Sequence, residues 1–293
     1  MTLEILVERE FDLAEGPLWD SHAGLVRWVD IPRGAIHSFD LSSRHCTSTY
    51  VTSPVGSIAL CSDGRVIVAA GSELRLLDEA ACHPVISELP IRDHRLRFND
   101  GAADPAGRYV IGTTSRAKPI AGAASLWSFD GSRWSEIRRS VTISNGIAWL
   151  PNGDLIYVDT PTQRIDRFAY DVDTGEVGDL VSSVAIDPRD GAPDGVALDA
   201  EGGIWVALWD GGAIRRYVDN RVDIEIAVPA RLVTSVAFAG VDLATMVITT
   251  ARLERNGYPK ARDDLGGTVF IAALGLRGAT VPLVRAPVSD GLP

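Results

Sequence analysis

The segment that decides the fold is SNGIAWLPNGDLIYV, residues 144–158. Two apolar runs, 147–150 and 155–158, flank the turn sequence Pro-Asn-Gly-Asp. Because Asn-Gly readily adopts the positive φ of a tight hairpin turn, the segment predicts two antiparallel strands. The polar dyad Asn145-Gly146 stands directly before the first of them.

The same arrangement recurs along the whole chain. A small or polar dyad is followed by an apolar run and a turn six times, at Gly16-Pro17, Gly56-Ser57, Asp100-Gly101, Asn145-Gly146, Asp194-Gly195 and Thr234-Ser235. Successive dyads are 40, 44, 45, 49 and 40 residues apart. A unit of this length made of short strands cannot bury its own apolar face and has to stack against its neighbours. Since no long stretch has helical periodicity, the sequence predicts an all-β fold, a six-bladed β-propeller.

We expect residues 1–293 to form a single domain, because the period runs through nearly the whole chain. Residues 4–11 and 268–273 are strand-like segments at the two ends of the repeat. The N-terminal segment is expected to join the last blade and close the ring, which removes a free sheet edge. The alternative is two independent terminal strands on separate edges.

Composition excludes several classes of partner. A formal net charge of −11 and the absence of Lys or Arg runs longer than two argue against nucleic acid. No run of apolar residues is long enough to cross a membrane, and the N-terminus has no secretory signal core. The three cysteines, Cys46, Cys61 and Cys82, lack metal-ligand spacing and suit a reducing compartment. The expected location is therefore cytoplasmic, and the sequence does not define an oligomeric state.

In a propeller the innermost strands line a central channel, so residues at the same phase of the repeat form one ring. The ring candidates, in blade order, are Glu15, Gly56 or Ser57, Asn99 or Asp100, Asn145, Asp194, and Thr234 or Ser235. Taken singly, the residues next to glycine are explained by turn chemistry, and their recurrence at one phase is what favours a shared site. Carboxylate and amide oxygens suit one divalent cation, Ca²⁺, Mg²⁺ or Mn²⁺, with Zn²⁺ or Fe²⁺ as further options.

The histidines lie off this phase. We expect His22, His37, His45 and His83 to occupy surface or loop positions. His94 is a possible exception, because it precedes the ring candidate Asn99 by five residues. The two Trp-Asp pairs, at residues 19–20 and 209–210, are too few for a WD-repeat scaffold.

The segment RFNDGAADPAGRY, residues 97–109, resembles the regucalcin/gluconolactonase family of metal-dependent sugar lactonases. Further blocks that carry the resemblance follow the same order along the chain, at 15–19 with 28–31, 143–146, 193–202 and 234–238. The resemblance implies a six-bladed propeller with one divalent cation near the top of the channel. By motif, it places the metal ligands at Glu15, Asn145 and Asp194, and the substrate contacts at Arg97 and Asn99.

The resemblance also implies a reaction, the hydrolysis of a small-molecule sugar lactone to an aldonic acid. The cation would polarise the lactone carbonyl, and Asp194 would act as general base, with Asp100 in a supporting role. A carboxylate bound to a cation has a lowered pKa, so direct attack by a hydroxide on the cation is an alternative. A phosphotriesterase-like hydrolase and a non-catalytic calcium-binding propeller are the other functions that fit the pattern.

One stretch departs from the family pattern. Members of the regucalcin type carry acidic residues shortly after the Gly-Thr of the third blade, whereas here Gly112-Thr113 is followed by TSRAK, residues 114–118. We hypothesise that Arg116 or Lys118 faces an anionic group on the substrate; the alternative is an ordinary solvated loop.

Overall fold

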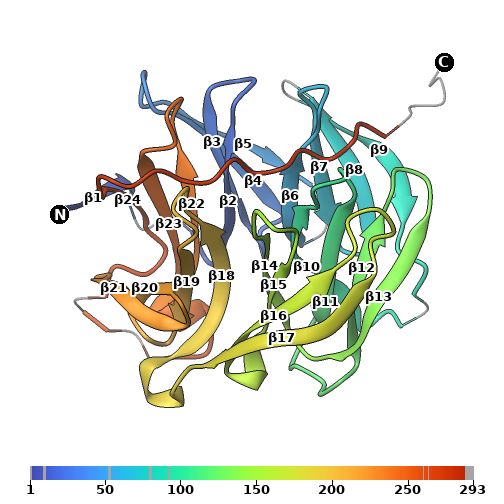
Figure 1. The fold of residues 1–293 in the computed structure, drawn as a ribbon. Coiled ribbons are helices and arrows are strands. Elements are labelled where there is room, and N and C mark those ends of the chain that lie inside the picture. Colours follow the sequence, from blue (N-terminus) through green and yellow to red (C-terminus); the bar gives the residue numbers. More distant parts are fainter. Residues whose placement is uncertain are drawn as a thin grey trace.

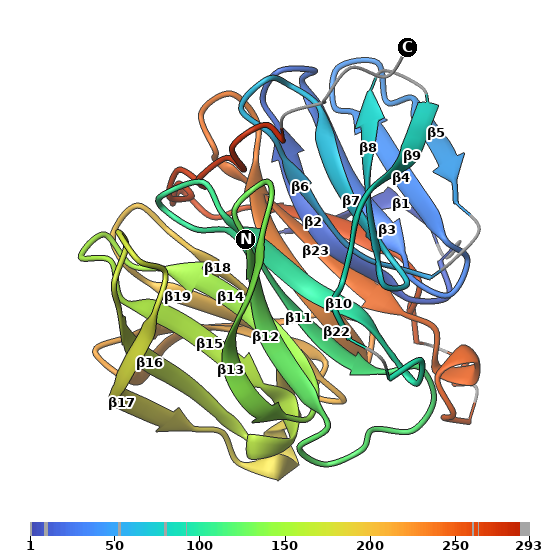
Figure 2. The ribbon, with the colours of Figure 1, turned by 90° about the vertical axis from the view of Figure 1, so that its right-hand side faces the viewer.

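The structure is a computed structural model that describes residues 2–8, 11–51, 54–78, 81–91, 93–259, 261–262 and 264–287. The side chains of residues 78 and 81–84, Cys82 and His83 among them, lie outside this description. Six four-stranded antiparallel sheets are arranged around a channel, so the predicted six-bladed β-propeller is confirmed (Figures 1 and 2). The described part of the chain contains no helix that is both long and apolar enough to cross a membrane.

The first three blades follow one another in chain order. Blade 1 contains β2 (Ala14–Asp20), β3 (Leu25–Asp30), β4 (Ala35–Asp40) and β5 (Cys46–Tyr50). Blade 2 contains β6 (Val55–Leu60), β7 (Val66–Ala70), β8 (Glu73–Asp78) and β9 (Ala81–Glu88). Blade 3 contains β10 (Leu96–Ala103), β11 (Tyr109–Ser115), β12 (Ala124–Phe129) and β13 (Trp134–Val141).

The next two blades have the same composition, and short 3₁₀ helices lie between some of their strands. Blade 4 contains β14 (Ser144–Trp149), β15 (Leu155–Asp159), β16 (Arg164–Tyr170) and β17 (Val177–Ala185). Blade 5 contains β18 (Ala192–Leu198), β19 (Ile204–Trp209), β20 (Ala213–Val218) and β21 (Arg221–Ala227). The 3₁₀ helices are η1 (Thr160–Thr162), η2 (Pro188–Asp190) and, in blade 6, η3 (Leu253–Arg255).

Blade 6 joins the two ends of the repeat. It contains β22 (Leu232–Ala239), β23 (Thr245–Ala251), β24 (Val269–Ala273) and the N-terminal strand β1 (Leu3–Val7). Leu3 is opposite Ala272 in an antiparallel pair, so β1 covers the edge of β24. The first strand of each blade, β2 to β22, contacts its counterparts in the neighbouring blades, while strands such as β5, β9 and β17 lie at the rim (Figure 2).

The hydrophobic core is divided among the interfaces between blades. One buried cluster occupies each of the six interfaces and draws side chains from both blades. At the closure of the ring, for example, Phe11 and Trp28 pack with Val247 and Val269 of blade 6. No blade buries its apolar faces by itself, which is the physical reason for the closed ring.

Each innermost strand carries a β-bulge at its dyad. The register shifts fall between Glu15 and Leu18, Val55 and Ser57, Phe98 and Gly101, Asn145 and Ile147, Pro193 and Val196, and Val233 and Ser235. A bulge inserts an extra residue and re-aims the side chains next to it. The repeated dyads in the sequence therefore correspond to six β-bulges, one at the same position in the innermost strand of each blade.

The small residues of the dyads also permit close contact between neighbouring innermost strands. A Cβ atom added to Gly56 would lie 2.4 Å from the carbonyl oxygen of Phe98, and one added to Gly146 would lie 2.7 Å from that of Asp194. The backbone of one blade thus occupies the space where the next blade would otherwise carry a side chain.

The expectation for the histidines is wrong at His37. This residue lies on β4 and is buried, with its ring stacked on Trp28 at 5.6 Å between centroids. Burial lowers the pKa of His37 to about 4, with Arg33 adding to the effect, so the ring is neutral. Its Nδ1 lies 2.8 Å from Ser48 Oγ. His22, His45 and His94 are exposed, as expected.

Gly56→Ala is expected to lower the free energy of unfolding by about 1–3 kcal/mol, because the new methyl group overlaps the β10 backbone. Gly178→Ala on the outer strand β17 is the matched control, since its nearest neighbour is the side chain of Ala169. Urea unfolding of both variants measures the difference. An unchanged stability in Gly56→Ala would contradict the close approach.

Candidate functional site

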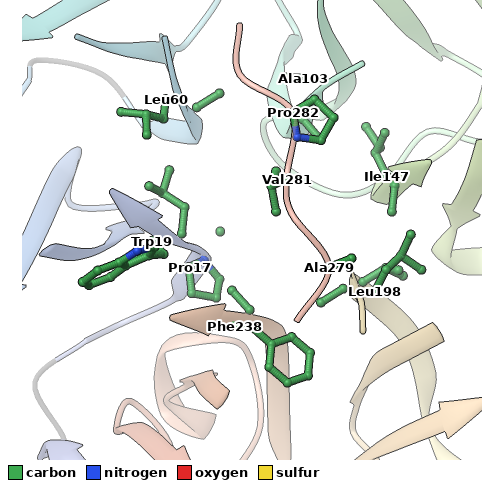
Figure 3. A pocket seen from close by; sticks show the side chains of 18 of the residues that line it. Pro17, Trp19, Leu60, Ala103, Ile147, Leu198, Phe238, Ala279, Val281 and Pro282 are labelled. Carbon is green, nitrogen blue, oxygen red and sulfur yellow. The ribbon is translucent and has the colours of Figure 1, made fainter. Parts of the chain in front are cut away.

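The channel contains a cavity of about 330 Å³ (Figure 3). Apolar side chains that follow the dyads line it, among them Trp19, Leu60, Ile147, Leu198 and Phe238. Asp100, Ser57 and Ser235 also line it, whereas Glu15, Asn99, Asn145 and Asp194 do not. The apolar cavity therefore borders the ring at Ser57, Asp100 and Ser235, and those other four polar candidates lie outside its wall.

The C-terminal segment crosses the cavity. Figure 1 shows it in red across several blades, and Figure 3 shows residues 279–282 passing over the lining side chains. The amide of Ala279 donates to the Leu198 carbonyl, and that of Val284 donates to the Leu60 carbonyl, each at 2.9 Å. The segment is thus tied to blades 5 and 2 on either side of the cavity.

The polar candidates lie at the bulges of their strands. Glu15, Asn99, Asn145 and Asp194 are each 9% exposed or less, although they come from four different blades. Asn99 Nδ2 donates to Asn145 Oδ1 at 2.6 Å and to the Ser144 carbonyl at 2.8 Å. The structure therefore brings Asn99 and Asn145 into direct contact across the interface of blades 3 and 4.

Thr160, which the sequence analysis missed, orients the Asn145 amide. The Thr160 hydroxyl donates to the Pro193 carbonyl at 2.8 Å and accepts from Asn145 Nδ2 at 2.7 Å. Because its proton is committed to Pro193, the hydroxyl accepts from Asn145, and the amide oxygen points the other way. Thr160 lies in η1, just beyond the strand that pairs with β14, and only sheet register would have placed it there.

Three carboxyl groups of the ring repel one another. Burial raises the pKa of Glu15 to about 8, and the charge of Asp100 adds to the increase. Burial also raises the pKa of Asp194 well above its ordinary value, with Glu15 and Asp100 adding to the effect. The pKa of Asp100 rises to about 6 through its own burial. Without a positive charge between them, these groups cannot all be ionised at neutral pH.

The ring candidates of blades 2 and 6 have structural roles. Ser57 Oγ donates to the Gly101 carbonyl at 3.2 Å. Thr234 Oγ1 donates to the Ala14 carbonyl at 2.6 Å and so links blade 6 to blade 1. Their hydroxyls hold neighbouring strands together beside the carboxylates.

Arg97 adds a positive charge beside the ring. Its Nη1 donates to Asn99 Oδ1 at 2.9 Å and to the Phe98 carbonyl at 2.7 Å. Burial and the charge of Arg116 lower the pKa of Arg97 to about 10, against the opposing charge of Glu15. Arg116 lies at the exposed edge of the same blade, where its Nε donates to the His94 carbonyl at 3.1 Å.

The donor set fits a divalent cation. Among the described residues, the Asp194 carboxylate has no hydrogen-bond donor, and the Glu15 carboxylate accepts only from the amide of Gly16, at 2.7 Å. The described residues contain no group of three His, Cys, Asp or Glu side chains placed to hold a metal. The donor set at the bulges instead combines two carboxylates, Glu15 and Asp194, with a third oxygen from the amide of Asn145. Carboxylate and amide oxygens are the ligands that hard cations prefer.

Comparison with known proteins identifies the family. Residues 13–252 match the model of the SMP-30/gluconolactonase/LRE-like region. The chain belongs to this family. The resemblance inferred from the sequence is thereby confirmed.

Relatives of this chain extend over nearly its whole length. A candidate sugar lactone lactonase of Bacillus subtilis, YvrE, is 36% identical over 270 residues, 89% of this chain and 91% of the relative. The 6-deoxy-6-sulfogluconolactonase of Pseudomonas putida is 33% identical over 287 residues, 96% of this chain and 98% of the relative. A solved structure of the calcium-binding protein regucalcin from Agrobacterium tumefaciens matches with a TM-score of 0.88 at 28% identity, covering 97% of this chain and 98% of that chain.

The raised pKa values predict how the stability of chelated protein depends on pH. An unfolded Glu15 ionises near pH 4.5, whereas the folded one keeps its proton until about pH 8. The folded state binds more protons between these values, so the free energy of unfolding falls as pH rises from about 5 to 8. Thermal melts in chelator across this range measure the slope.

Glu15→Gln should flatten this pH dependence, and Glu176→Gln, at an exposed position, should leave it unchanged. Equal slopes for the two variants would show that the ring carboxylates do not control the effect.

Proposed function

We propose that this protein is a divalent-metal-dependent hydrolase that opens a sugar lactone to its aldonic acid, with residues 1–293 acting as one domain. The proposal is supported by the burial of Glu15, Asn145 and Asp194, which come from three blades, and by the effect of the Glu15 charge on the Asp194 carboxyl. Asn145 contacts Asn99, and the charge of Glu15 also acts on Arg97. Membership of the SMP-30/gluconolactonase/LRE-like family and the lactonase names of two relatives support the substrate class.

In this proposal Glu15, Asn145 and Asp194 hold the cation. When bound, a divalent cation supplies Lewis-acid polarisation of the lactone carbonyl. Thr160 accepts a hydrogen bond from the Asn145 amide nitrogen and so turns the amide oxygen toward the site. Asn99 donates a hydrogen bond to that oxygen, which leaves its second lone pair for the cation. The identity of the cation is left to experiment among Ca²⁺, Mg²⁺, Mn²⁺, Zn²⁺ and Fe²⁺.

Asp194 is the proposed general base. Its buried carboxylate accepts no hydrogen bond from a described residue, so one oxygen can hold the cation while the other accepts a proton from water. A water molecule deprotonated by Asp194 would attack the carbonyl carbon. The C–O bond of the ring then breaks, and the released alkoxide takes the proton that Asp194 had accepted. The Arg97 guanidinium, fixed by Asn99 and the Phe98 carbonyl, orients the substrate for this attack. Asp100 acts through its charge on the other carboxyl groups.

Asp194→Ala is expected to lower kcat/KM for lactone hydrolysis by about 10²–10⁴-fold, because the proton acceptor is lost. Asp179→Ala, at an exposed position on β17, is the control and should retain activity. Acid release from a panel of lactones, with each cation restored to chelated protein in turn, measures the effect. Full activity in a folded Asp194→Ala variant would refute the assignment.

The same panel separates the alternative functions. Hydrolysis of organophosphates in place of lactones would identify a phosphotriesterase-like enzyme. Cation binding without hydrolysis of either class would identify a calcium-binding propeller.

Thr160→Val is expected to weaken cation binding by about 10–100-fold, because a residue that orients a metal ligand is removed while its volume is kept. Thr160→Ser keeps the hydroxyl and should bind as the unaltered protein does. Calorimetric titration with Ca²⁺ or Mn²⁺ measures the dissociation constants. Identical values for Thr160→Val and the unaltered protein would mean that the hydroxyl does not position Asn145.

A further inference from the structure

Two arginines lie at one end of the β10–β11 pair in blade 3. Arg97 on β10 is opposite Thr114 on β11, and Arg116 follows Thr114 by two residues. Arg116 is the first residue after β11, and its amide donates to the Arg95 carbonyl at 2.7 Å, which holds it beside the start of β10. The charge of Arg116 acts on Arg97, so the two side chains lie near one another.

Both guanidinium groups are fixed by oxygens that carry no charge. Arg97 donates to Asn99 Oδ1 and the Phe98 carbonyl, and Arg116 donates to the His94 carbonyl. Among the described residues, neither arginine has a carboxylate within ion-pair distance. Arg95, at the same edge of the blade, has Asp93 as its counter-ion at 2.7 Å.

This lack of a counter-charge is costly at Arg97. The side chain is partly buried, and burial together with the nearby charge of Arg116 lowers its pKa. Glu15 is the carboxylate that acts on Arg97, and in the proposed function its charge is shared with the cation. The guanidinium groups of Arg97 and Arg116 therefore remain available as hydrogen-bond donors to an oxyanion, the acceptor that guanidinium groups bind best.

We propose that Arg97 and Arg116 bind an anionic group on the substrate, so that the site selects lactones carrying a carboxylate, sulfonate or phosphate over neutral sugar lactones. This inference rests on the proposed lactonase function. Arg97 lies beside the ring and Arg116 at the exposed edge, so the lactone carbonyl would face Asp194 and the anionic group would face outward. Arg116 is the specificity-determining residue in this arrangement.

The test compares kcat/KM for three substrates: D-glucono-1,5-lactone, D-glucaro-1,4-lactone, which carries a carboxylate, and 6-phosphoglucono-1,5-lactone. The unaltered protein should prefer at least one anionic lactone over the neutral one. Arg116→Ala should lower that ratio by about tenfold or more, through KM, since a charge-assisted hydrogen bond is lost. Arg95→Ala removes an exposed arginine that has its own counter-ion, and should leave the ratio unchanged. The carboxylate and phosphate substrates show which oxyanion is preferred.

An unchanged ratio in Arg116→Ala, or a preference for the neutral lactone in the unaltered protein, would overturn the inference. Calorimetric titration with gluconate and with glucarate provides a readout that needs no catalysis. The dianion should bind more tightly than the monoanion, and Arg116→Ala should abolish the difference. If no lactone is hydrolysed but glucarate binds more tightly than gluconate, the lactonase proposal fails and the anion-binding proposal stands. Equal affinities for gluconate and glucarate in the unaltered protein would refute anion binding.

Discussion

The β-bulge in each innermost strand is the constraint on which the rest of the site depends. A regular strand would alternate its side chains between the two faces of the sheet, and both faces are needed to pack against neighbouring blades. At the bulge this alternation is interrupted, so a residue such as Asn145 or Asp194 turns out of the packing layer without disturbing the apolar residues beyond it. The ring thus obtains polar groups at one height while the blade interfaces stay apolar.

This geometry concentrates charge in a place that cannot easily tolerate it. Glu15 and Asp194 are buried, and both experience the charge of Asp100. A cation would relieve the repulsion within the ring, and a substrate anion would relieve the repulsion between Arg97 and Arg116. In this view both charge clusters are parts of one binding site whose partners come from outside the chain. In the apolar cavity next to them Asp100 is the charged residue among the lining side chains of the described part of the chain, and the C-terminal segment crosses this cavity.

The fold and the position of the ring could be predicted from the sequence, because both depend on the spacing of the six dyads. Glu15, Asn145 and Asp194 were placed together for that reason and by the family resemblance. Thr160 was missed, since its contact with Asn145 depends on where the partner strand ends. His37 was misplaced because the rings that bury it, Phe11 and Trp28, come from other segments. The position of the C-terminal segment across the cavity depends on hydrogen bonds to Leu60 and Leu198. Both residues are far away in the sequence, so no local sequence pattern predicts these contacts.

Crystals soaked with Mn²⁺ and measured for anomalous scattering provide the most direct test of the central claim. The account predicts one strong peak in the channel, within about 2.0–2.6 Å of Glu15, Asp194 and the Asn145 amide oxygen. A peak held by other residues, or an empty ring in crystals of protein that binds Mn²⁺ in solution, would contradict it.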